Sequence, residues 1–174
     1  MSSKNFHLLP ILLIAIALQS CCRESNLTTI ASAPVYMSYD ELRKSVQSAP
    51  PTPLKDPGKI YFKDNYIFIN EKFEGIHIID NTNPSAPQNI GFIKIPGNVD
   101  LAIKGNYLYA DNSVDLAVID ITNPLQVKEV SRIESMFPYG MPGAAPRKPM
   151  AIDRNKGIVV GWKDSLITQS TRCN

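Results

Sequence analysis

The side chain with the clearest potential for chemistry in this 174-residue sequence is the thiol of Cys21. It comes directly after an apolar run over residues 8–18, which Lys4 precedes. A run of this length suits the central region of a secretory signal, whereas a membrane-spanning helix needs roughly 20 residues. Residues 1–20 are therefore expected to be a signal peptide. The thiol behind it is a candidate for covalent modification, because a thiolate is a strong nucleophile near neutral pH.

The residues before the cysteine resemble the lipobox of bacterial lipoproteins. Leu18 supplies the branched apolar residue three positions before Cys21, and Ser20 supplies the small residue directly before it. The resemblance implies that Cys21 carries a lipid and that the leader is cut in front of it. Cys22 fits less well, because Gln19 would then occupy the apolar position. We therefore expect a lipid-anchored protein of the cell envelope. Since no aspartate follows the anchor, we expect it in the outer membrane. The sequence leaves open which leaflet holds the lipid.

Charge and cysteine content narrow the classes of partner. The chain has 18 Lys plus Arg and 16 Asp plus Glu, and Lys4 is lost with the leader. Nucleic-acid binding needs a clustered basic surface, so nucleic acid is not expected as a partner. Cys21, Cys22 and Cys173 do not make a disulfide framework, although Cys173 could pair with Cys22 or with another chain. No cluster has metal-ligand spacing and no catalytic constellation is present, so we expect no metal, no cofactor and no enzyme activity.

Residues 21–35 are expected to be a tether, and residues 36–58 a short helix followed by a proline-rich spacer. Ser38 and Glu41 have the spacing of a capping box, and Met37 and Leu42 could flank it as a hydrophobic staple. This pattern predicts a helix over about residues 39–47. Residues 49–53 are rich in proline and predict a stiff, extended segment.

From residue 59 onward the sequence has the period of β-strands and repeats itself. Residues 59–69 read as a hairpin, and residues 101–109 overlay them with an offset of 41. Residues 116–124 overlay residues 76–84 with an offset of 40, so one residue is lost in the loop between the two matches. A period of 40 to 41 residues with four short strands is typical of a β-propeller blade, and a β-sandwich would not predict it.

The expected fold is all-β, with propeller-like blades at residues 59–99 and 100–133. A partial third repeat is expected over 150–174, with a hairpin at residues 150–161 and then a divergent tail. Propellers typically have about 4–8 blades, so this array would not close a ring. We therefore expect a truncated form or a fragment of a longer gene product.

These repeats resemble a known family. Residues 76–80 and 118–121, each followed by a Thr-Asn-Pro sequence, are similar to LVIVD-repeat proteins. Residues 37–43, 95–100 and 109–111 are similar to the LVIVD-repeat lipoproteins of Bacteroidetes. The resemblance covers about residues 36–163. It implies a propeller and a lipid anchor, and it implies no particular activity.

The repeated polar residues have two interpretations. Asp80 and Asp120 could line a central channel and hold a cation, or their carboxylates could accept hydrogen bonds from backbone N–H groups in turns. We favour the turn interpretation. His77 is expected to be partly exposed or hydrogen-bonded rather than a ligand, because Ala117 replaces it in the second repeat.

The best candidate binding segment is the Pro/Gly/Met-rich loop over residues 134–149, which interrupts the repeats. Its candidate contacts are Met136, Phe137, Tyr139 and Met141, because Met and aromatic side chains on loops are adaptable contacts. Alternatively, the loop covers the open end of the domain with its own apolar groups. Copper binding by its methionines is not expected, since no His or Cys lies nearby.

We therefore expect a lipid-anchored envelope protein that acts as a non-catalytic binding or scaffold module for a protein or glycan. One alternative is a fragment of a propeller enzyme that acts on envelope polysaccharide. Another is a truncated product without an independent function.

Overall fold

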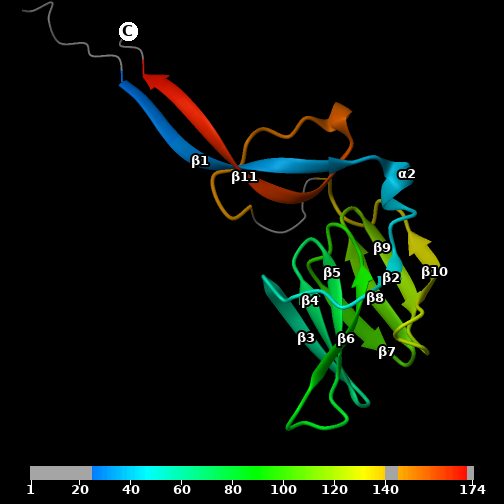
Figure 1. Cartoon of the computed structure of the whole chain (residues 1–174). Helices are drawn as coiled ribbons and strands as arrows, with labels where there is room; N and C mark the ends of the chain where they lie inside the picture. The colour runs from blue at the N-terminus through cyan, green and yellow to red at the C-terminus, as the bar shows by residue number, and fades with distance from the viewer. Residues whose placement is uncertain (1–24, 140–144, 172–174) are drawn as a thin grey trace, which may run out of the picture. The chain divides into compact units, whose positions relative to one another are not determined.

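The computed structural model describes residues 25–139 and 145–171 and shows a chain that is mostly β-strand (Figure 1). Cys21, Cys22, Met141 and Cys173 lie outside the described residues. Among the described residues, those within 31–165 form one compact unit, and residues 25–30 and 166–171 belong to another. Among the residues described, no helix is both long and apolar enough to cross a membrane.

The larger unit contains two consecutive four-stranded antiparallel units, which we call blade 1 and blade 2 (Figure 1). Blade 1 consists of β3 (Pro57–Lys63), β4 (Tyr66–Glu71), β5 (Gly75–Asp80) and β6 (Gln88–Lys94). Blade 2 consists of β7 (Leu101–Lys104), β8 (Tyr107–Asn112), β9 (Asp115–Asp120) and β10 (Lys128–Ile133). In both blades each strand pairs with the next one along the chain. The expectation of two propeller-like blades is confirmed.

The single-residue gap between the repeats lies at a hairpin tip, as the sequence predicts. In blade 1 Glu71 pairs with Gly75, which leaves residues 72–74 in the tip. In blade 2 Asn112 pairs with Asp115, which leaves residues 113–114. Hairpin tips tolerate a change of length because no ladder hydrogen bond is lost there.

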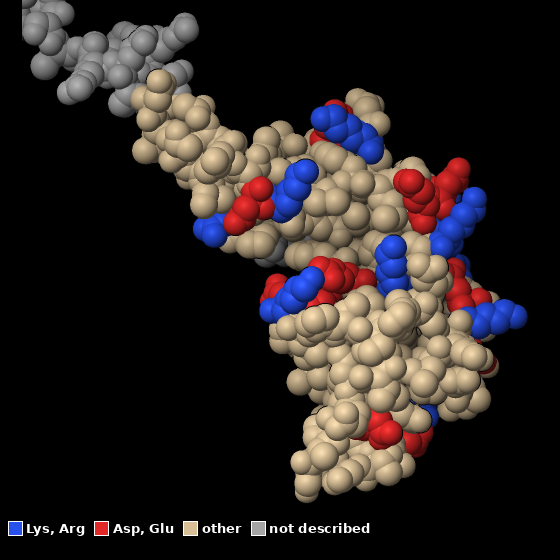
Figure 2. Space-filling model, viewed as in Figure 1, with Lys and Arg blue, Asp and Glu red and all other residues tan. Residues whose placement is uncertain are grey.

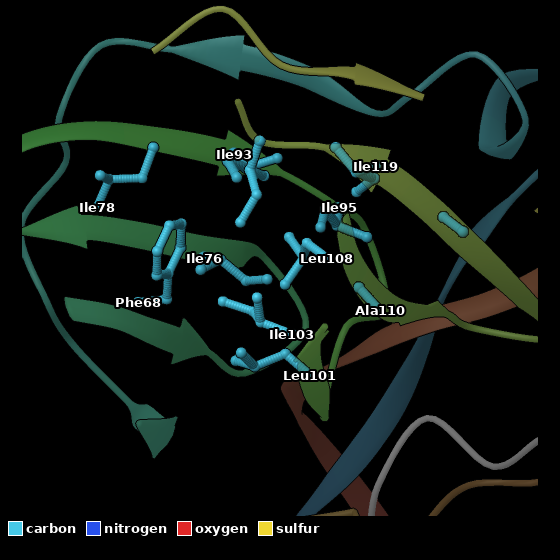
Figure 3. Close-up of a cluster of buried hydrophobic side chains, with 12 residues drawn as sticks. Phe68, Ile76, Ile78, Ile93, Ile95, Leu101, Ile103, Leu108, Ala110 and Ile119 are labelled. Carbon is cyan, nitrogen blue, oxygen red and sulfur yellow. The ribbon is translucent and has the colours of Figure 1, made fainter. Parts of the chain in front are cut away.

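The main core lies between the two blades (Figure 3). Strands place alternate side chains on opposite faces, and in β7 Leu101 and Ile103 are buried while Ala102 and Lys104 are exposed. Burying one such aliphatic side chain contributes roughly 1.5–3 kcal/mol. The buried residues of this core are Phe68, Ile76, Ile78, Ile93, Ile95, Leu101, Ile103, Leu108, Ala110, Ala117, Ile119 and Ile121.

The helix before the blades is shorter than predicted. Helix α2 spans Tyr39–Leu42, and the predicted capping box of Ser38 and Glu41 is confirmed. The prediction that the helix continues to about residue 47 is wrong, because β2 (Gln47–Ala49) begins there and pairs with β6 as a fifth strand. Pairing with the outer edge of β6 satisfies backbone N–H and C=O groups that this edge would otherwise leave open. Leu42 is buried and Met37 packs against its cluster, as expected of the staple.

The hairpin expected at residues 150–161 is not formed. Residues 150–153 are not a strand, and residues Arg154–Lys156 form the 3₁₀ turn η1. The following strand, β11 (Ile158–Thr171), pairs with β1 (Ser25–Met37), and the Met150 N–H donates to the Ser32 carbonyl at 2.8 Å. Strand β1 was not expected, because the sequence before the helix reads as a polar tether. Together β1 and β11 form a two-stranded sheet that is separate from the two blade sheets.

Candidate functional site

Residues of the predicted binding loop lie in two different environments. Met136 is exposed, and the Phe137 N–H donates to the Val114 carbonyl at 2.9 Å, next to blade 2. Tyr139 instead packs against the cluster around Leu42, and its hydroxyl donates to the Gly157 carbonyl. Burial raises the pKa of Tyr139. Tyr139 thus covers an apolar cluster, whereas Met136 is exposed and Phe137 is half-buried.

Phe137 lines an open pocket of about 470 Å³ on blade 2. The pocket lies over β7, β8 and β9 and is bordered by one residue of β3. Its lining residues are Lys59, Asp100, Leu101, Ala102, Tyr109, Asp111, Leu116 and Phe137. Apolar walls with a few charged groups are the usual composition of a binding pocket. Sequence reasoning found only Phe137, because most of the other residues lie on β7, β8 and β9 and meet only when these strands pair in blade 2.

The charged residues of the pocket come from corresponding positions of the repeats. Lys59 and Asp100 are 41 residues apart, and their Nζ and Oδ2 atoms lie 2.8 Å apart. The Asp111 carboxylate accepts hydrogen bonds from the backbone N–H groups of Val99 (3.0 Å) and Asp100 (2.8 Å). Burial raises the pKa of Asp111, and these two hydrogen bonds oppose the rise. Asp111 therefore holds the start of β7 in place rather than pairing with another acid.

A buried amide connects the two blades beside this pocket. The Asn70 side chain donates to Asn98 Oδ1 at 2.6 Å, and Asn98 Nδ2 donates to Asp111 Oδ1 at 2.8 Å. Asn70 and Asp111 are corresponding positions of the two repeats. At Gly58 a Cβ atom would lie 2.3 Å from Asn70 Oδ1, so the backbone of β3 approaches this chain of contacts too closely for any side chain. These residues fix how the blades meet.

His77 is buried, and its Nε2 atom lies 3.0 Å from Glu71 Oε2. The Glu71 carboxylate also accepts the backbone N–H groups of Lys55 (3.0 Å) and Asp56 (2.5 Å). Burial alone would raise the pKa of Glu71, but these hydrogen bonds together lower it below its ordinary value. The expectation of a hydrogen-bonded histidine is confirmed. The pair attaches the proline-rich spacer to blade 1.

Asp80 and Asp120 close turns, as the favoured interpretation predicts. Each Oδ1 accepts the backbone N–H two residues further on, from Thr82 and Thr122 respectively, at 2.8 Å. Hydrogen bonds from these threonines lower the pKa of both carboxyls. Over residues 25–139 and 145–171, no group of three or more His, Cys, Asp or Glu residues could hold a metal ion.

The ionic cluster around Asp115 was not predicted from the sequence. Asp115 is fully buried; its Oδ2 lies 3.0 Å from Arg132 Nη1 and 3.3 Å from Arg43 Nε. Its Oδ1 accepts the Ser135 N–H at 2.9 Å, which fixes the start of the binding loop. Burial lowers the pKa of Arg132, but Glu129 and Asp115 more than offset this and raise it. Gly75 stands at the corresponding position of the first repeat, so the repeat pattern gave no signal for this cluster.

Comparison with known proteins agrees with this division of the chain. The family model of the LVIVD repeat matches residues 57–93 and again residues 97–134. No curated protein and no solved structure matched the chain. The first matched segment coincides with blade 1 and the second contains blade 2. The chain therefore contains two consecutive segments that match the LVIVD repeat, each folded as a four-stranded antiparallel blade.

Proposed function

We propose that this chain is a lipid-anchored, non-catalytic binding module of the cell envelope that takes a protein partner on blade 2. The observation that carries the proposal is the pocket beside Phe137, which opens on an apolar sheet face. Blade 2 presents Ala102, Tyr109 and Leu116 there, whereas blade 1 buries the corresponding Phe68 and Ile76. An uncovered apolar face in a repeat array is a surface for another protein.

The location is proposed from the sequence before the blades. The apolar leader and the lipobox-like residues before Cys21 support lipidation of that thiol and anchoring in the outer membrane. One acyl chain gives only marginal membrane binding, so two or more chains on the same residue are needed for a stable anchor. The lipid would hold the blades at the membrane while blade 2 takes its partner.

The test is capture of a partner from detergent-solubilised envelopes by the full chain, followed by chemical crosslinking. Phe137→Glu places a charge at the edge of the apolar face and is expected to lower the yield of the captured protein at least tenfold. Leu166→Glu is the matched control, because Leu166 is an exposed apolar residue of β11 and not part of either blade. Equal capture by the Phe137→Glu variant and the wild type would contradict the proposed surface.

The non-catalytic part of the proposal has its own test. The purified chain is incubated with envelope polysaccharides, and newly formed reducing ends are measured. We expect no release above a heat-denatured control. Release that depends on the Lys59 and Asp100 pair of the pocket would instead indicate an enzyme.

A further inference from the structure

The contact between the blades joins two different faces of the repeat. We call face A the side of a blade that carries Leu101, Ile103 and Leu108 in blade 2, and face B the side that carries Phe68 and Ile78 in blade 1. Face A of blade 2 packs on face B of blade 1 and forms the buried core (Figure 3). Strand registry supports these assignments, because Ile103 pairs with Leu108 and Phe68 pairs with Ile78. The interface is therefore directional, A on B.

Face A of blade 1 has no such cover along β3. The offset of 41 relates Leu101 and Ile103 to Ile60 and Phe62. Leu101 and Ile103 are 8% and 9% exposed, whereas Ile60 and Phe62 are 57% and 67% exposed. Figure 2 shows a wide uncharged surface over β3 to β6. Along β3 the same type of surface is thus open in blade 1 and buried in blade 2, whereas His77 and Ile79 of β5 on face A of blade 1 are buried.

The proline-rich spacer covers only the far part of this face. Asn89 Nδ2 donates to the Thr52 carbonyl at 2.8 Å, and Glu71 holds the backbone of Lys55 and Asp56. These contacts reach Asn89 of β6 and Glu71 at the end of β4. Ile60 and Phe62 stay outside the covered area.

Face B of blade 2 is open in the complementary way. Its residues Tyr109, Leu116 and Val118 correspond to Phe68, Ile76 and Ile78, which are buried in the interface between the blades. Tyr107 is 45% exposed, whereas the corresponding Tyr66 packs against the core. The pocket beside Phe137 belongs to this face.

We infer that the protein partner is a second copy of this chain, which docks face A of its blade 1 on face B of blade 2. This inference rests on the proposed function and names the partner of the same surface. Along β3 the contact would repeat, between chains, the packing that β7 of blade 2 makes on blade 1 within one chain. Because the contact is heterologous, each chain keeps one free face A and one free face B until a ring closes. Propellers have about 4–8 blades, so about two to four chains would close one.

Charge along the inner strands agrees with this arrangement. Lys59 and Asp100 occupy the same position of successive repeats and pair with each other. Docking a second chain would bring its Lys59 next to Asp100 of the first. Lys and Asp would then alternate at this position around the ring, and no like charges would be adjacent.

The test measures the mass of the full chain, purified in detergent, by native mass spectrometry. Phe62→Glu places a charge on face A of blade 1, and Ala102→Glu places one on face B of blade 2. Both positions are exposed in a single chain, so both variants are expected to fold. Circular dichroism checks their folding. The wild type and the Leu166→Glu control are expected to form one closed oligomer of about two to four chains. Each single variant is expected to be monomeric. Mixing the two variants is expected to give a 1:1 dimer, because one intact A and one intact B face remain.

Three results would overturn the inference. They are a monomeric wild type, an oligomer that survives both single variants, and a mixture that stays monomeric. A monomeric wild type that still captures a different envelope protein through Phe137 would leave the proposed function standing. Failure of both capture and self-association would remove both proposals.

Discussion

At the scale of single residues, the buried polar groups of this chain act on the backbone. Glu71, Asp111 and Asp115 each accept at least one backbone N–H from a segment outside their own hairpin. An ionised carboxylate makes stronger hydrogen bonds than a neutral acceptor, and losing it leaves several donors without a partner. Each of these acids therefore attaches a spacer, a strand start or a loop to the nearest blade.

Asn98→Ala is expected to destabilise the protein more than any exposed amide substitution. The change removes one hydrogen-bond partner of the Asn70 amide and one of the Asp111 carboxylate in the contact between the blades, while their backbone partners stay. Each lost hydrogen bond contributes about 0.5–1.5 kcal/mol net. Urea denaturation followed by circular dichroism measures the loss. Gln126→Ala, at an exposed position, is the control and should change the free energy of unfolding by less than about 0.5 kcal/mol.

Glu71→Gln is expected to destabilise the protein in a way that depends on pH. The folded state lowers the pKa of Glu71 below its ordinary value of 4.5, so the carboxylate stabilises the fold above that pH. This stabilisation is lost as the pH falls through the folded-state pKa. The difference in unfolding free energy between wild type and variant should therefore shrink between pH 6 and pH 3. A difference that grows on acidification would contradict the role assigned to Glu71.

At the scale of elements, the repeats were predictable because local chemistry and period agree. Asp80 and Asp120 correctly predict turns, and Ser38 and Glu41 correctly predict the start of the helix. The one-residue difference in length between the repeats lies at a hairpin tip, as predicted. The pairing of β2 with β6 and of β1 with β11 was not predictable. The pairing of β2 depends on the free edge of β6, which exists only after blade 1 has formed. Strands β1 and β11 form a sheet of their own from segments far apart in the sequence, and the sequence of neither segment reveals its partner.

Gly75→Ala is expected to prevent normal closure of the first β4–β5 tip. A Cβ atom at this position would lie 2.0 Å from the Ile93 carbonyl oxygen, and a backbone atom of the neighbouring strand cannot move aside cheaply. Gly105→Ala is the matched control, because its φ is +58° and nothing lies within 4 Å of the added Cβ. The control should lose only about 1–2 kcal/mol from its backbone conformation. Urea denaturation of both variants should show the larger loss for Gly75→Ala; equal losses would contradict the close approach of β6.

At the scale of the whole molecule, the sequence identified one residue of the candidate pocket. Phe137 was expected to be a contact and lines the pocket, but Tyr139 from the same loop packs inside. Of the remaining pocket residues, only Lys59 comes from β3; the others lie on or directly before β7, β8 and β9, and they share a surface because these strands pair in blade 2. Their side chains are ordinary strand residues, so no local motif marks them.

The proposed membrane anchor is the feature of the whole chain that one substitution can test. Cys21→Ala removes the thiol that the lipobox-like sequence would present for lipidation. The variant should therefore no longer incorporate an alkyne-labelled fatty acid. It should also move from the membrane fraction to the soluble fraction. Cys22→Ala is the matched control, because Gln19 leaves Cys22 without the apolar residue three positions before it; this variant should stay labelled and membrane-bound. The measurement is gel fluorescence of the labelled lipid together with fractionation of the envelope. If Cys21→Ala kept its label while Cys22→Ala lost it, the anchor would have to be assigned to Cys22, and if both kept it, to a different residue.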